Sequence, residues 1–191
     1  MLDMNHELPR PETSHTPEVR LFNVDAMSDE QIIVTYRGYW TVANHLGNED
    51  TDDFDQMDIG DGLNEQVAAE VRDLASRDPE RVKQLVTRTT ASQEDSDQDL
   101  AANAAPALLN YDYAFTRDTL ISITMGEAYE RCVSRGISSS DSGSGYASET
   151  ALGLMRELMR DRLTPEQIAD FQAHAAAFDP GWPLEPARPE E

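Results

Sequence analysis

The chain has 191 residues, a charged fraction of 27% and a formal net charge of −22, from 37 acidic and 15 basic residues. Because affinity for phosphate is built from clustered lysine and arginine, this balance argues against direct binding to nucleic acid. It favours a basic protein as partner, and a surface that only keeps the protein in solution is the alternative. One cysteine, Cys132, excludes an internal disulfide and a cysteine zinc site, and no apolar run approaches the roughly 18 residues of a membrane span, so we expect a cytoplasmic location.

The two ends of the chain are predicted to be disordered tails, over residues 1–18 and 183–191. The first contains Pro9, Pro11 and Pro17 among polar residues, which bury too little apolar area to offset the entropy lost on ordering. The second is rich in proline and glutamate and is expected to fray. A helical domain is predicted between them, over residues 19–182.

A first helix is predicted over residues 28–46. Ser28 and Gln31 have the spacing of a capping box, and Ile32, Tyr36 and Trp40 continue as a stripe at helical spacing. A strand is the competing interpretation, because residues 32–36 favour sheets and a glycine follows them. The cap and the longer spacing favour the helix. Tyr36 and Trp40 are candidate anchors for a partner, and the alternative is that they belong to the core.

An acidic linker is predicted over residues 47–62. Its carboxylates resemble those of segments that fold against basic surfaces, since Phe54, Met57 and Ile59 lie between them. A calcium loop is excluded, because Met57 occupies the fifth ligand position and Asp58 the position that requires glycine. A solvated linker is the alternative. The candidate partner-binding residues here are Glu49, Asp50, Asp52, Asp53, Asp55, Asp58 and Asp61.

Central helix pairs are predicted over residues 63–135. A first helix has Val67, Val71 and Leu74 on one face, and Asp78 with Pro79 starts a second. Residues 92–99 look too polar to bury, after which helical spacing resumes at Leu100. A proline at position 106 is expected to kink or shorten that third helix, and a fourth begins near residue 116.

Each helix pair is joined by a turn with aspartate, from Leu74 to Asp78 and from Leu108 to Asp112. In this respect residues 64–125 resemble repeats of the HEAT type. The resemblance implies a curved stack of helix pairs that binds other proteins. Two units fall short of the three or so that repeat stacking requires. The fold class is therefore all-α, either an irregular helical bundle or a short repeat-like array with flexible acidic loops.

A glycine- and serine-rich loop over residues 136–145 precedes a C-terminal helix pair over residues 146–179. The first of these helices is amphipathic, and its arginines make it the one locally basic face of the chain. Thr164, Pro165 and Gln167 form a second capping box, which starts the last helix. The basic face comprises Arg156, Arg160 and Arg162.

No catalytic, cofactor-binding or metal-binding residue is predicted. Nucleophilic catalysis by Cys132 needs a nearby imidazole, and nothing in the sequence brings His45 or His174 to it. No pair of histidines has the spacing of a helical metal site.

The leading hypothesis is an acidic helical module that binds a basic protein, in an inhibitor, immunity-type or adaptor role. The first alternative is a small enzyme with a carboxylate or metal site between helices. The second is a structural subunit that forms a homo-oligomer through the helix that begins at Tyr146.

Overall fold

The structure is a computed structural model that describes residues 21–45, 54–125 and 146–178, with the backbone alone for residues 44, 45, 54–58 and 178. Every element in these ranges is a helix, which confirms the all-α fold class. The predicted tails and the predicted loop over residues 136–145 lie outside the described residues. The elements are α1 Asp29–His45, α2 Phe54–Ala75, α3 Pro79–Thr90, α4 Asp95–Ala104, the short 3-10 helix η2 Ala105–Leu108, α5 Tyr113–Thr124, α7 Tyr146–Asp161 and α8 Pro165–Phe178.

Two capping boxes predicted from the sequence are present. At the start of α1, the Ser28 backbone N–H donates to Gln31 Oε1 at 2.8 Å, and the Gln31 N–H donates to Ser28 Oγ at 3.2 Å. At α8, the Thr164 N–H donates to Gln167 Oε1 at 3.0 Å, and the Gln167 N–H donates to Thr164 Oγ1 at 3.3 Å. Each box satisfies two amide groups that would otherwise lack a partner at a helix end. The helix, and not the strand, is the correct interpretation of residues 29–45.

The acidic linker prediction is wrong from residue 54 onward, because α2 begins at Phe54 and not near residue 63. The helix continues through this acidic stretch because its inner face packs against α1. Gly60 makes that approach close: a Cβ atom there would lie 2.9 Å from the Ala43 backbone nitrogen and 3.1 Å from Val42 Cγ1. Residues 46–53 of the predicted linker lie outside the described residues.

The turns before α3 and α5 share one geometry. In each, the backbone N–H of the aspartate donates to the carbonyl of the leucine four residues earlier, at 2.8 Å for Asp78 and 2.7 Å for Asp112. Each aspartate side chain then accepts from the backbone N–H three residues later, at 3.1 and 3.0 Å. The two helix starts are therefore equivalent at an offset of 34 residues, as the aspartate turns in the sequence suggest. A HEAT-type array remains a prediction.

The prediction that residues 92–99 are too polar to bury is wrong. The segment forms the start of α4, and Ser96, Asp97 and Asp99 are buried. Burial is possible because α1 and α7 bring hydrogen-bonding groups to these side chains. Pro106 ends the α-helix as expected, since it lies in the 3-10 turn η2.

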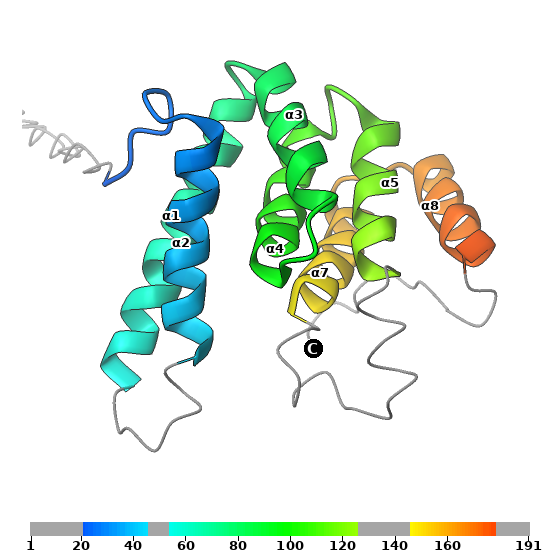
Figure 1. Ribbon diagram of the computed structural model, residues 1–191. Coiled ribbons are helices and arrows are strands. Elements are labelled where there is room, and N and C mark those ends of the chain that lie inside the picture. Colours follow the sequence, from blue (N-terminus) through cyan, green and yellow to red (C-terminus); the bar gives the residue numbers. More distant parts are fainter. Residues whose placement is uncertain (1–20, 46–53, 126–145, 179–191) are drawn as a thin grey trace, which may run out of the picture.

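The helices follow one another across the molecule, from α1 and α2 on one side to α8 on the other (Figure 1). The helix α4 is the centre of the packing, because it contacts α1, α2, α3, α5 and α7. Buried alanines along α4 and η2 allow these neighbours to approach closely, and they are Ala101, Ala102, Ala104 and Ala105. Buried apolar side chains from Val24 to Ala175 form a single core.

Candidate functional site

The two aromatic candidates for partner binding are core residues. Tyr36 is 1% exposed and Trp40 is 7% exposed, because this stripe of α1 faces α2 and α4. The Trp40 ring makes an edge contact with the Tyr146 ring at a centroid distance of 6.1 Å. In this structure neither ring is available as a surface anchor, so the prediction that they bind a partner is corrected to the alternative, a role in the core.

The predicted acidic contact is described only in part. Residues 49, 50, 52 and 53 lie outside the described residues, and for Asp55 and Asp58 the structure gives only the backbone position on α2. Asp61 is exposed on α2, near Ile59, whose side chain is 60% exposed. The same helix exposes Glu65, which binds Arg72, the only basic residue of α2.

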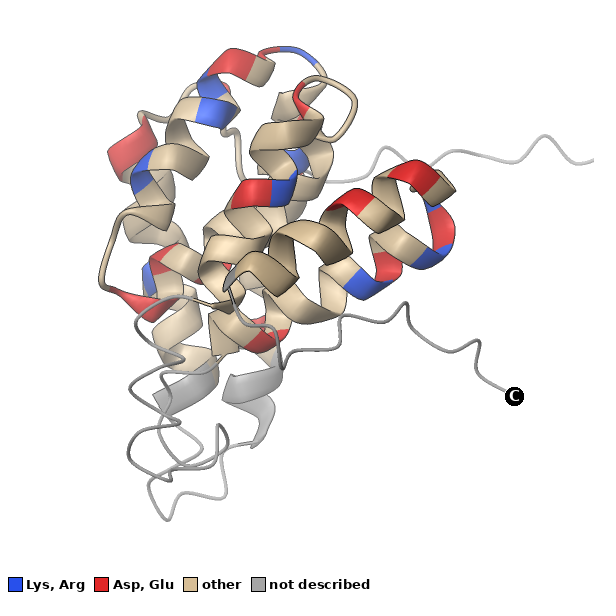
Figure 2. Cartoon of the chain, turned by 90° about the vertical axis from the view of Figure 1, so that its right-hand side faces the viewer, with Lys and Arg blue, Asp and Glu red and all other residues tan. Residues whose placement is uncertain are grey.

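Most cations in the described ranges are bound by carboxylates of the same chain. Eight of the ten lysine and arginine residues there form ion pairs, and blue and red positions adjoin along the helices in Figure 2. Several of these pairs link α3 or the turn before it to the start of α1: Arg77 with Asp25, Arg81 with Asp29, and Arg88 with Glu30. The described surface therefore keeps an excess of carboxylates.

The arginines predicted to form a basic face are largely engaged within the chain. Arg160 binds Asp161 at 2.7 Å, and Arg162 donates to the Pro106 carbonyl at 3.4 Å. Arg156 is half-buried on α7. Two of the three guanidinium groups on which the homo-oligomer hypothesis rests thus have partners inside the chain.

A group of buried carboxylates at the start of α4 was missed by the sequence reasoning. Asp97 is 5% exposed, and both of its oxygens accept from Arg37 of α1, at 3.1 and 2.9 Å from Arg37 Nη2. The bond to Asp97 is the largest cause that raises the pKa of Arg37, so the guanidinium remains charged. This is a two-point ion pair between two packed helices, and it fixes α1 against α4.

Asp99 lies two residues further along α4, at the side of Tyr36. The Tyr36 hydroxyl donates to Asp99 Oδ2 at 2.6 Å, and Asn103 Nδ2 donates to the Tyr36 oxygen at 3.3 Å. Burial raises the pKa of Asp99, while its hydrogen bonds with Tyr36 and Thr150 oppose that rise. Burial and the nearby carboxylate also raise the pKa of Tyr36, so its hydroxyl stays protonated as a donor.

Asp95 meets the start of α7. Its carboxyl group accepts hydrogen bonds from the backbone N–H groups of Ala147 and Tyr146, the first two residues of that helix. Asp95 Oδ2 is buried with no hydrogen-bond partner among the described residues. Burial, with a smaller contribution from Asp99, raises the pKa of Asp95 to about 6. One carboxyl group thus caps a helix from another part of the chain and titrates close to neutrality.

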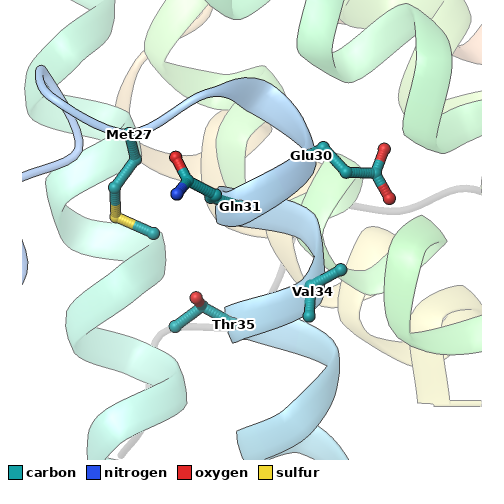
Figure 3. Close-up of a pocket in the computed structure, with 5 residues that line it drawn as sticks. All are labelled: Met27, Glu30, Gln31, Val34 and Thr35. Atoms are coloured by element: carbon teal, nitrogen blue, oxygen red, sulfur yellow. The ribbon is translucent and has the colours of Figure 1, made fainter.

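This arrangement offers hydrogen-bond acceptors and a titratable proton, but no metal site. Within the described ranges no three histidine, cysteine, aspartate or glutamate side chains are placed to hold a metal ion. A shallow hollow of about 290 Å³ lies elsewhere, on the outer side of α1, and is lined by Met27, Glu30, Gln31, Val34 and Thr35 (Figure 3). The buried carboxylates do not line it.

Comparisons with known proteins find no match to this chain, whether among protein-family models, curated proteins or solved structures. None of the described helices is both long enough and apolar enough to cross a membrane. Any statement of function therefore rests on the chain's own charges and contacts.

Proposed function

We propose that the chain is an acidic helical interaction module that binds a basic protein partner. The observation that carries this proposal is the pairing of the cations. Because most lysine and arginine side chains in the described ranges bind carboxylates of the same chain, they are not available to neutralise the remaining acidic groups. With a net charge of −22, the chain attracts a basic surface over distances of about 8 Å at physiological salt.

The outer side of α2 is the proposed centre of contact. It combines the acidic positions Asp55, Asp58 and Asp61 with the exposed apolar side chain of Ile59. Carboxylates speed the encounter with a basic partner, and a buried apolar contact slows its release. The module would act by covering the partner's basic surface, which suits an inhibitor, immunity-type or adaptor role.

The test compares two variants with the same net charge. In the first, Asp53, Asp55, Asp58 and Asp61 are changed to asparagine; in the control, four exposed acids on α5, α7 and α8 are changed to the corresponding amides, at Asp118, Glu149, Glu157 and Glu166. Each protein is used to capture partners from lysate of the source cell at low salt. The affinity of a retained basic protein is then measured with purified components at several salt concentrations.

The proposal predicts that the parent and the control variant retain the same basic protein and that the first variant loses it. The affinity should fall by roughly tenfold or more as salt rises to a few hundred millimolar. Equal retention by both variants would contradict the proposed contact. A partner whose affinity does not respond to salt would contradict the electrostatic role and favour a buried site or self-assembly.

A further inference from the structure

At the junction between α4 and α7, one buried carboxylate oxygen has no hydrogen-bond donor among the described residues. Asp95 and Asp99 lie one helical turn apart on α4, and each contacts α7: Asp95 through the first two backbone amides of that helix, Asp99 through Thr150. The unpaired oxygen is Asp95 Oδ2. An acceptor buried in this way is destabilising, and a bound proton relieves it by converting a carboxylate oxygen into a donor.

We propose that the α4–α7 junction is a proton-responsive element, in which uptake of one proton by the Asp95–Asp99 pair strengthens the docking of α7 on α4. The proposal is independent of the acidic interaction function. It concerns carboxylates that face the interior, whereas that function concerns carboxylates on the outer side of α2.

Among the residues that the structure describes, the charged and titratable groups around the pair do not supply a compensating cation. From α1, the Tyr36 hydroxyl already donates to Asp99, and Arg37 is bound to Asp97. From α2, Glu65 raises the pKa of Asp99 further. From α3 and α5, the nearest cations of those helices are held by other carboxylates: Lys83 by Asp112, Arg88 by Glu30 and Arg117 by Asp118 and Asp170. From α7, the groups are Tyr146 and Glu149, which carry no positive charge.

The sign of the effect follows from proton linkage. When α7 undocks, Asp95 is exposed to water and its pKa returns from about 6 to the ordinary value of 3.8. Between these two values the docked state binds more protons than the undocked state, so acidification favours docking. For one group with this shift, the docking equilibrium constant should be about tenfold larger at pH 5 than at pH 7.5.

The experiment is hydrogen exchange of the full chain, read at the amides of residues 150–155 in α7 and corrected for the intrinsic dependence of exchange on pH. The expected result is about tenfold greater protection at pH 5 than at pH 7.5. Asp95→Asn keeps the shape of the side chain and removes its charge. This variant should show high protection at pH 7.5 and little change with pH.

Asp118→Asn is the matched control, because it removes one carboxylate from an exposed position on α5 and should keep the dependence of the parent. Protection in α7 that does not change with pH in the parent, or a dependence that persists in Asp95→Asn, would overturn the proposal. If Asp95→Asn does not fold, the Asp95 carboxyl carbon in the parent is titrated by NMR. A midpoint near 4 overturns the proposal, and a midpoint near 6 with a parallel change in α7 protection supports it.

Discussion

Aspartates on the α5 side of the molecule and aspartates on α4 differ in which protonation state their surroundings favour. Asp112 binds Lys83 and the Phe115 amide, and these bonds lower its pKa. Asp170 binds Arg117 and Tyr113, and its pKa is also lowered. On α4, burial raises the pKa of Asp95 and of Asp99.

The difference lies in the supply of donors and not in the residue type. Asp112 and Asp170 each have a cation and a second hydrogen-bond donor. Asp99 has the hydroxyl of Tyr36, and Asp95 has two backbone amides of α7, but neither is paired with a cation in the part of the chain that the structure describes. The acidic residues that give the net charge of −22 therefore include carboxylates that stabilise the folded state and carboxylates that destabilise it.

The largest expected effect comes from removing the donor of Asp99. Tyr36→Phe deletes only the hydroxyl and leaves a buried carboxylate without its shortest hydrogen bond, so we expect a loss of about 2 kcal/mol in the free energy of unfolding. Urea unfolding at pH 7 measures it. Tyr39→Phe on the same helix, at a half-buried ring, is the control and should change stability by less than about 0.5 kcal/mol. Equal effects of the two variants would contradict the importance of the Tyr36–Asp99 bond.

The two groups of aspartates should also give the stability opposite slopes with pH. The raised pKa of Asp95 means that stability rises as the pH falls from 7 towards 4. The lowered pKa values of Asp112 and Asp170 mean that their contribution is present above about pH 4 and is lost as the pH falls through their folded-state values. Unfolding measured between pH 8 and pH 3 should therefore show a maximum between about pH 4 and pH 5.

Asp95 determines how much the free energy of unfolding rises as the pH falls from 7 towards 4. Its shift corresponds to about 3 kcal/mol in full, which screening by solvent at this partly exposed group reduces to about 1.5 kcal/mol. Relief of repulsion among the other carboxylates adds to the same slope, so Asp95→Asn is compared with the parent to isolate it. An unchanged slope in that variant would show that the rise comes from general repulsion.

A smaller effect is expected at the helix caps. Asp78→Ala removes the acceptor for the Arg81 amide at the start of α3 and should lower the free energy of unfolding by about 1 kcal/mol. Asp78→Asn keeps an acceptor and should recover most of the loss. If the asparagine variant is as unstable as the alanine variant, the negative charge and not the hydrogen bond is what matters at this cap.

The smallest effect is expected at an exposed ion pair. Lys83→Met removes the partner of Asp112 and a cation that lies 5.1 Å from the Phe115 ring. Exposed pairs contribute little, so the shift in the unfolding midpoint should be smaller than that of Asp78→Ala and should shrink further in about 0.5 M salt. If Lys83→Met shifts the unfolding midpoint more than Tyr36→Phe does, the ion pair of Asp112 matters more to stability than the hydrogen bond of Asp99, contrary to the account.

Much of the fold could be predicted from the sequence, because its signals are local. Capping boxes at Ser28 and Thr164, and the aspartate cap at Asp78, place the starts of three helices, and the apolar spacing gives their inner faces. The fourth central helix is predicted near residue 116, and α5 begins at Tyr113. The start of α2 was missed because its first turns are acidic. Packing against α1 outweighs that composition, and it depends on contacts distant in sequence such as the one at Gly60.

The buried carboxylates could not be found in the same way. A run rich in serine, glutamate and aspartate normally stays in solvent, and its burial here depends on donors from two distant segments, Tyr36 with Arg37 of α1 and the first residues of α7. One signal was present: Asp95, Asp99 and the buried Ala102 are separated by four and three residues, which places them on one helix face. For Tyr36 the sequence leaves a surface anchor and a core residue both open, since its hydroxyl partner is 63 residues away.

The contrast between the two groups of aspartates is tested most directly by an NMR titration of the aspartate carboxyl carbons in the full chain. The account predicts a midpoint near 6 for Asp95 and midpoints below 3.8 for Asp112 and Asp170 in the same sample. If Asp95 instead titrates near 3.8, close to Asp112 and Asp170, then its carboxylate is as well supplied with hydrogen-bond donors or water as theirs. That result would contradict the account.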